Sequence, residues 1–116
     1  MDERLEKALD FSNFMVTLNN QKRVLFEQYQ QNLVHYHKGG QFSVTQELIS
    51  FCQSLVALEQ ETVVLTDDNK QPIEIDPLED FLSDILNVYA EASNKYLSEF
   101  NKIKKNRSVE GIVEYE

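Results

Sequence analysis

Two long stretches, one near each end of the chain, contain no proline or glycine and constrain the fold most. In residues 2–38 the apolar side chains recur mostly three or four positions apart. From Leu78 to Ile103 the same spacing holds for about seven turns. Each pattern predicts a long amphipathic helix, and the first would be about 50 Å long at roughly 1.5 Å per residue. Two such helices bury their apolar faces most simply by packing antiparallel.

Local signals indicate where these helices begin and end. Lys38 is followed by two glycines, a combination typical of a helix C-terminus. The polar run at 19–23 interrupts the apolar stripe and includes two asparagines of modest helix propensity, so a kink or break there is the alternative to one continuous helix. Asp76 can cap the last helix, with Pro77 in its first position. Lys104 and the lysine after it suit the negative end of that helix.

The middle of the chain predicts a shorter helix and extended segments. Residues 41–44 alternate as a short strand, and a helix follows to about residue 59, capped by Ser43 or Thr45. Segments 62–66 and 73–75 flank a polar turn and predict a β-hairpin. The predicted fold is α+β and mainly α. Two long antiparallel amphipathic helices carry, at one end, a middle helix and a small antiparallel β-sheet made of the short strand and the hairpin.

We expect a single domain over residues 1–105 and a C-terminal tail over residues 106–116. The tail combines apolar side chains with one glycine, Gly111. It should be loose alone and ordered against a partner or a neighbouring copy. Its candidate partner-binding residues are Arg107, Val109, Ile112, Val113 and Tyr115.

Negative charge is concentrated in residues 59–84. Nine acidic residues and one lysine, Lys70, give this stretch a charge of −8, out of −9 for the whole chain. Such a balance argues against general nucleic-acid binding and against anionic membrane surfaces. The candidate partner-binding residues of this acidic patch are Asp67, Asp68, Glu74, Glu79, Asp80 and Asp84.

Several residue types suit metal or catalytic chemistry, but their spacing does not. A calcium loop starting at Asp67 has Pro72 in place of the required glycine and Leu78 in place of the required glutamate. On a helix, His35 and His37 would point about 200° apart, which disfavours a shared metal. Cys52 lies on the apolar stripe of the middle helix and suits the core. We therefore predict no enzymatic activity and no catalytic, cofactor-binding or metal-binding residues.

The cellular setting can also be estimated from the sequence. The single cysteine rules out an internal disulfide, which favours a reducing cytoplasm. The mixed charges of residues 1–4 do not resemble a signal peptide, and no apolar run approaches the roughly 20 residues of a membrane span. We expect a cytoplasmic protein.

Three segments resemble proteins of a viral group: LEKALDFSN at 5–13, ELISF at 47–51 and KKNRSVE at 104–110. With them, the chain is similar to small proteins of large contractile-tailed, myovirus-type phages of marine bacteria. The resemblance implies a phage origin, with a place in the host cytoplasm or in the virus particle. It implies no defined activity and assigns no functional residues.

These features leave two hypotheses for function. The first is a non-enzymatic protein–protein interaction or assembly module that binds a partner or itself through its helical surfaces and the tail. The alternative is an acidic decoy that binds a host nucleic-acid-binding enzyme through the 59–84 patch and modulates it. Neither predicts direct nucleic-acid binding, a membrane or a small-molecule substrate.

Overall fold

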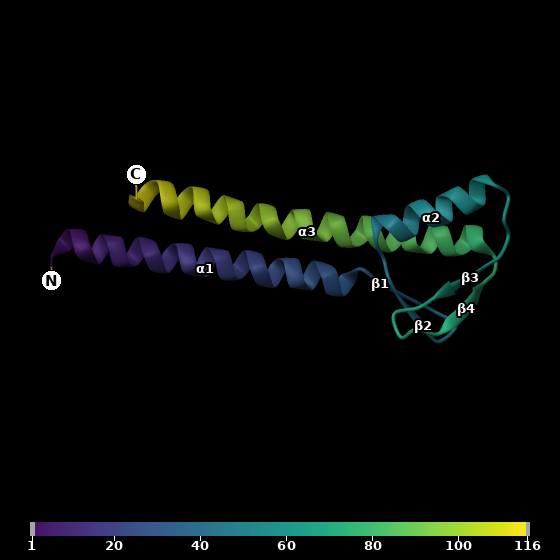
Figure 1. Cartoon of the computed structure of the whole chain (residues 1–116). Helices are drawn as coiled ribbons and strands as arrows, with labels where there is room; N and C mark the ends of the chain where they lie inside the picture. Colours follow the sequence, from purple (N-terminus) through teal and green to yellow (C-terminus); the bar gives the residue numbers. More distant parts are fainter. Residues whose placement is uncertain (1, 116) are drawn as a thin grey trace. The chain divides into compact units, whose positions relative to one another are not determined.

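Both long helices predicted from the sequence are present in the computed structural model of the chain (Figure 1). It describes the backbone of residues 2–115 and the side chains of residues 2–105. The fold is α+β and mainly α, with two long helices, a middle helix and small antiparallel sheets. In chain order the elements are α1 (Glu3–Asn32), β1 (Val34–His37), β2 (Gly40–Ser43), α2 (Gln46–Ala57), β3 (Val63–Thr66), β4 (Pro72–Ile75) and α3 (Leu78–Tyr115).

The chain is organised as two compact units, which we describe separately. The helical unit comprises the residues up to 29 and those from 95 onward, and so holds most of α1 and the C-terminal part of α3. The mixed unit comprises residues 30–94, with the end of α1, both hairpins, α2 and the start of α3. The single domain expected over residues 1–105, followed by a tail, stays a prediction.

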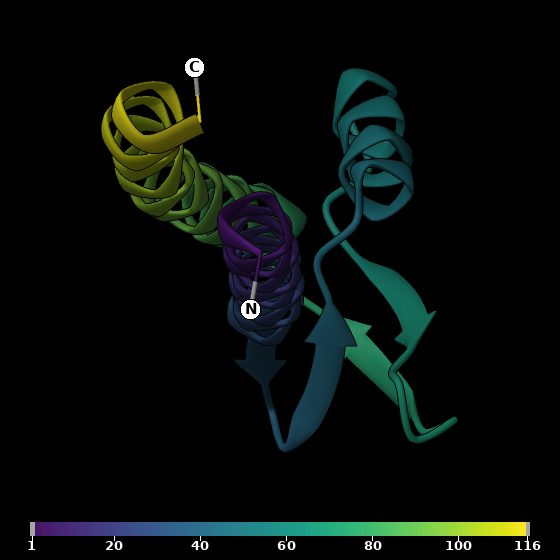
Figure 2. The same cartoon turned by 90° about the vertical axis from the view of Figure 1, so that its left-hand side faces the viewer.

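In the helical unit, α1 and α3 run antiparallel and side by side (Figures 1 and 2). Leu18 and Leu25 of α1 are buried, and Tyr29 stacks on Tyr96 of α3 with 4.5 Å between ring centroids. The polar run at 19–23 does not interrupt α1, which is one helix from Glu3 to Asn32. Leu18 and Leu25 are seven residues apart, so they lie on one helical face on either side of the polar run.

The first hairpin corrects the predicted end of α1. The helix stops at Asn32, six residues before Lys38, and β1 pairs antiparallel with β2. The β-branched and aromatic residues of the Val-His-Tyr-His segment favour a strand. Lys38 and Gly39 form a two-residue loop in which both have positive φ, 48° and 79°, as a type I′ hairpin turn requires. Lys38 and its glycine therefore reverse the chain instead of ending a helix.

The second hairpin, β3 with β4, forms where the sequence predicted it. The short strand did not join it: β2 pairs with β1, so the described residues form two separate two-stranded sheets. Of the two predicted caps of α2, Thr45 is the one used, since its Oγ1 accepts a hydrogen bond from the backbone N–H of Leu48 at 3.0 Å. Ser43 instead donates its hydroxyl to the Asp68 carboxylate at 2.8 Å.

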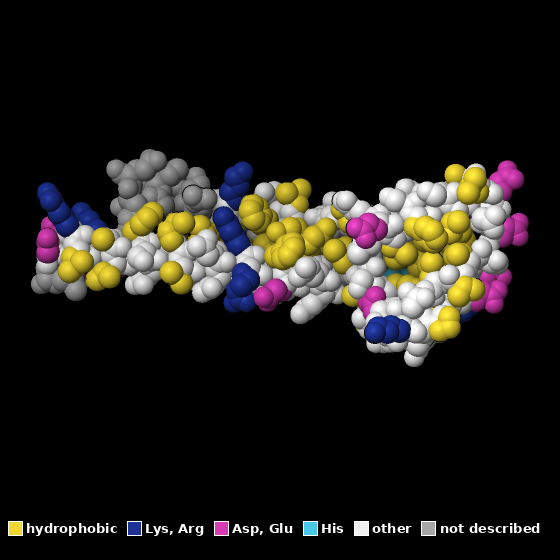
Figure 3. Space-filling model, in the orientation of Figure 1, with side chains coloured by type: hydrophobic (Ala, Val, Ile, Leu, Met, Phe, Trp, Pro, Cys, Tyr) yellow, Lys and Arg dark blue, Asp and Glu magenta, His cyan; other side chains and the backbone are white. Residues whose placement is uncertain are grey.

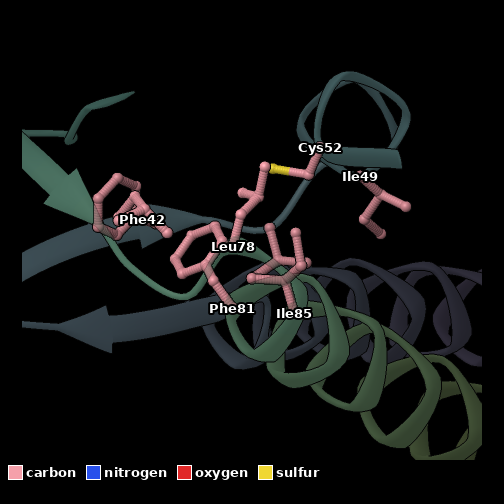
Figure 4. Close-up of a cluster of buried hydrophobic side chains, with 8 residues drawn as sticks. Phe42, Ile49, Cys52, Leu78, Phe81 and Ile85 are labelled. Atoms are coloured by element: carbon pink, nitrogen blue, oxygen red, sulfur yellow. The ribbon is translucent and has the colours of Figure 1, made fainter. Parts of the chain in front are cut away.

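The core of the mixed unit joins α2, both hairpins and the start of α3. Phe81 of α3 is almost fully buried and meets Phe42 of β2 edge to face, with 5.3 Å between ring centroids. Figure 4 shows Leu78 and Ile85 on the same side of α3, pointing toward Cys52 and Ile49 of α2. The cluster consists of Phe42, Val44, Ile49, Cys52, Ile75, Leu78, Phe81 and Ile85.

Candidate interaction surface

The N-terminal half of α1 carries a row of apolar side chains that the helical unit does not bury. Leu5, Leu9 and Val16 are 51%, 47% and 57% exposed. At 3.6 residues per turn they lie about 140–180° around the helix from Leu18, the side chain that packs inside the unit. Together with the exposed Ser12, these residues form what we call the outer face of α1 (Leu5, Leu9, Ser12 and Val16).

The second part of this stretch lacks charge, whereas Glu6, Lys7 and Asp10 lie beside Leu5 and Leu9. From Phe11 to Gln21 there are eleven consecutive residues without an acidic, basic or histidine side chain. An exposed helix normally carries charged residues on its solvent side, and a helix without them is typical of a covered position. Most of this stretch is nevertheless exposed. The outer face therefore combines apolar exposure with a charge-free stretch around Ser12 and Val16, while charged residues flank Leu5 and Leu9.

Other exposed apolar residues of the helical unit lie beside the contact between its two helices. Phe26 is exposed and has its ring 6.1 Å from that of Tyr96, which in turn lies 6.1 Å from Phe100. Lys22 holds its ammonium group 5.7 Å from the centre of the Phe100 ring, within range of a cation–π interaction. These contacts give the aromatic side chains partners inside the unit, unlike the outer face.

A shallow groove runs between α1 and α3 in the helical unit. Its volume is about 450 Å³. Its lining residues are Thr17, Asn20, Gln21, Val24, Leu25, Gln28, Glu99, Lys102 and Ile103, and more of the surface they present is apolar than polar.

Two members of the predicted acidic patch are used inside the fold. Asp67 is only 5% exposed, and its carboxylate accepts backbone N–H bonds from Gln41, Asn69 and Gln71 at 2.8–3.1 Å. The bond from Gln71, followed by those from Gln41 and Asn69, lowers the pKa of Asp67 against the opposing effect of desolvation. Asp68 accepts from the backbone N–H and the hydroxyl of Ser43.

The other four predicted residues of the acidic patch, Glu74, Glu79, Asp80 and Asp84, are exposed. Figure 3 shows acidic side chains along the margin of the mixed unit. One of them, Glu79, lines a cleft of about 540 Å³ together with Glu59, Glu61 and Asp76. The sequence places these residues in one acidic stretch, but their convergence on a cleft follows from the packing of the end of α2 against the start of α3.

The two histidines lie on β1 and not on a helix, which corrects their predicted geometry. At positions two apart on a strand they share one face, and both rings meet Phe81 edge to face at 5.5 and 5.4 Å. Their Nε2 atoms are buried and find no hydrogen-bond partner among the described residues. Asp84 Oδ2 lies 3.9 Å from Nε2 of His35.

The charge state of His37 follows from this position. Burial lowers its pKa, and the positive charges of Lys38 and His35 add to the effect, while Asp84 opposes it. Among the described residues, no three His, Cys, Asp or Glu side chains converge closely enough to hold a metal ion. Both histidine rings pack against Phe81. One sequence signal could have placed the two histidines on a strand: they alternate with Val34 and Tyr36 just before Lys38-Gly39, a possible hairpin turn.

Cys52 is fully buried in the core and forms no disulfide. Burial raises the pKa of its thiol, which reduces the thiolate available at neutral pH. A buried thiol in this state is a poor nucleophile, so its position matches that of a small apolar core residue.

The backbone of the predicted tail is helical, because α3 continues to Tyr115. The tail residues chosen as partner-binding lie outside the residues whose side chains the structure describes: Arg107, Val109, Ile112, Val113 and Tyr115.

Comparison with known proteins found no relative. No family model matches the chain, and neither a curated protein nor a solved structure is similar to it. Within the described part of the chain, neither long helix contains an apolar stretch sufficient to cross a bilayer.

Proposed function

We propose that the protein is a non-enzymatic interaction and assembly module that binds a protein through the outer face of α1. The observation that carries the proposal is the row of Leu5, Leu9 and Val16, each about half exposed, on a helix whose residues 11–21 have no charge. Exposed apolar patches on soluble proteins mark sites of protein–protein interaction when their members are contiguous.

The free energy gained by burying the outer-face side chains supports an interaction of moderate strength. Covering the exposed halves of two leucines and one valine contributes about 2–4 kcal/mol per copy before the costs of association. The helical unit has a small apolar core of its own, since Leu18 and Leu25 are its only buried side chains among the described residues. A partner laid along α1 would add the apolar layer that this pair of helices lacks.

The acidic decoy is the less supported alternative. A decoy must present its carboxylates to a partner, but Asp67 is buried and Asp68 is hydrogen-bonded to Ser43. These two residues stabilise the contact between hairpins, and four of the six predicted patch residues remain to provide an electrostatic surface.

Site-specific photo-crosslinking in the native cell tests the proposal. A photoreactive amino acid at position 16 should form an adduct with a protein, because that position would be covered. The adduct should be lost in a chain that also carries Leu5→Gln and Leu9→Gln, since these changes remove the apolar contacts. Position 53 on α2, exposed and polar, provides the background level. Equal labelling at positions 16 and 53, insensitive to the glutamine changes, would contradict the proposal.

A further inference from the structure

We infer that the two histidines of β1 hold the first hairpin against α3 at neutral pH and release β1 from α3 in mild acid. We call this contact the histidine contact (His35 and His37 of β1 against Phe81 of α3). It lies within the mixed unit and does not involve the outer face of α1. Three features of the contact support the release: the two faces of β1, the position of the buried ring nitrogens and the charges around them.

β1 meets α3 through histidine side chains. Side chains alternate between the two faces of a strand, so Val34 and Tyr36 lie on the face opposite to the histidines. Both imidazole rings meet the Phe81 ring edge to face, with 5.5 and 5.4 Å between ring centroids. The attachment of β1 to α3 therefore depends on the charge state of two titratable rings.

Protonation places a hydrogen-bond donor at a buried position. A charged imidazole carries a proton on each of its two nitrogens, so Nε2 is then an N–H donor. The Nε2 atoms of His35 and His37 are both buried, and neither has a hydrogen-bond partner among the described residues. Burying a charged donor without an acceptor is costly, whereas water solvates a released ring. The proton therefore favours the released form of β1.

The charges around the site make His37 the sensitive ring. Burial is the main reason why its pKa lies below the ordinary value, and the charges of Lys38 and His35 act in the same direction. Asp84 of α3 opposes them, and its Oδ2 lies 3.9 Å from Nε2 of His35, where it can stabilise a charge. β2 has no charged residue, and β4 meets the hairpin through the Glu74 carbonyl, which accepts a hydrogen bond from Lys38 Nζ at 3.3 Å.

β2 should stay in place when β1 is released. Phe42 of β2 is buried against Phe81, and Gln41 donates its backbone N–H to the Asp67 carboxylate at 3.1 Å. The pKa of Asp67 lies below its ordinary value of 3.8, so this carboxylate remains ionised in mild acid. Release of β1 therefore breaks its hydrogen bonds to β2 and leaves the second hairpin intact.

The pH range of the release follows from His37. A released ring has the ordinary pKa of 6.5 and the packed ring a lower one, so the released form takes up the proton first as the pH falls. β1 is therefore held above pH 6.5 and progressively released below it. A single histidine changes such an equilibrium by at most about tenfold per pH unit.

Amide hydrogen exchange, followed by NMR on the purified full-length protein, tests the histidine contact. Protection factors are corrected for the intrinsic effect of pH on exchange. Between about pH 7 and 5.5, those of the β1 amides that bond to β2 should fall about threefold or more. Those of β3 and β4 should stay constant. The matched variant His37→Phe keeps a ring against Phe81 but binds no proton, so it should lose most of this pH dependence.

Three results would overturn the inference. Protection that falls equally in both hairpins would mean global unfolding, and constant protection in β1 would mean that no release occurs. A full pH dependence in His37→Phe would exclude His37 as the sensor. The wild-type protein gives a check that needs no variant, since the ring-proton resonance of His37 should titrate below pH 6.5, over the range in which β1 protection falls. A midpoint at or above 6.5 would contradict the proposed release.

Discussion

Asp67 connects the two hairpins of the mixed unit through its carboxylate. It accepts a hydrogen bond from Gln41 of β2 at 3.1 Å, and two more from Asn69 and Gln71 in its own turn. The backbone N–H of Asp68 adds a bond to the Gln41 carbonyl at 2.8 Å. Because the sheets share no strand ladder, these bonds are a principal polar link between them.

Replacing Asp67 by Asn should destabilise the protein at neutral pH, since the amide nitrogen cannot accept the N–H bonds that the second carboxylate oxygen takes. The lowered pKa of Asp67 means that its contribution is present above its ordinary value of 3.8 and is lost as the pH falls through the folded value. The midpoint of urea unfolding should therefore differ clearly between Asp67→Asn and wild type at pH 7, and the difference should shrink in acid.

Glu74→Gln is the matched control for this comparison, because Glu74 is exposed on β4. Its unfolding midpoint should equal that of the wild type. If Asp67→Asn behaves like Glu74→Gln at pH 7, the carboxylate does not hold the hairpins together.

His37 should make the mixed unit sensitive to mild acid. Its folded pKa lies below the ordinary value of 6.5, so below that pH the unfolded chain binds the proton more readily and stability falls as the pH falls. His37→Gln should flatten the urea midpoint between about pH 5 and 7. The groups around the ring are His35 and Lys38 on the same hairpin, with Phe81 and Asp84 on α3. An unchanged slope in the variant would show that His37 does not carry this dependence.

At the scale of elements, the sequence predicted both long helices, the middle helix and the β3–β4 hairpin, because each has its own periodicity and end signals. It failed at the junction of α1 and β1. Leu33 and Tyr36 continue the helical spacing of α1, and Lys38 with two glycines resembles a helix end as much as a hairpin turn. The choice depends on pairing with β2, a contact that local patterns do not contain.

Gly40 of the first hairpin lies close to Ile73 of the second. A Cβ added there would lie 2.9 Å from Cγ1 of Ile73 on β4 and 3.2 Å from the carbonyl oxygen of His37. Gly40→Ala should therefore destabilise the protein by about 1–3 kcal/mol through overpacking. In an Ile73→Ala background the penalty should be smaller, because the nearest clashing atom is gone. Urea unfolding of the four chains of this double-mutant cycle measures the coupling.

Gly39→Ala is the control for Gly40→Ala, because its cost should come from backbone strain and not from a contact with Ile73. Nothing lies within 4 Å of its added Cβ, but its φ of +79° strains any other residue, at a cost of about 1–2 kcal/mol. Ile73→Ala should not change this cost. Equal coupling of Ile73 to both glycines would mean that the penalty at Gly40 does not come from the contact between hairpins.

At the scale of the whole molecule, the sequence drew attention to the acidic patch and the tail, and it missed the outer face of α1. All apolar residues of α1 were taken as one stripe, whereas Leu5 and Leu9 lie nearly opposite Leu18. A helical wheel together with the charge-free run at 11–21 would have separated the two faces. Which face packs internally still depends on α3, far away in the sequence.

Deleting residues 106–116 should weaken assembly, as the sequence hypothesis for the tail requires. Ellipticity should fall only in proportion to the helical residues removed, because the buried contacts of Leu18, Leu25 and Tyr29 lie outside the deleted segment. Sedimentation velocity over a range of concentrations measures the association. Unchanged association in the truncated chain would remove the tail from the proposed function and leave the outer face as the binding surface.

The central claim is that the outer face of α1 is covered in the native cell, and the alkylation rate of a cysteine placed there tests it most directly. Val16→Cys and Leu58→Cys have 57% and 71% exposed parent side chains within the isolated chain, so both would react readily if uncovered. We predict that a maleimide reagent labels Val16→Cys at least tenfold more slowly than Leu58→Cys in permeabilised native cells. Similar rates at the two positions would contradict the account.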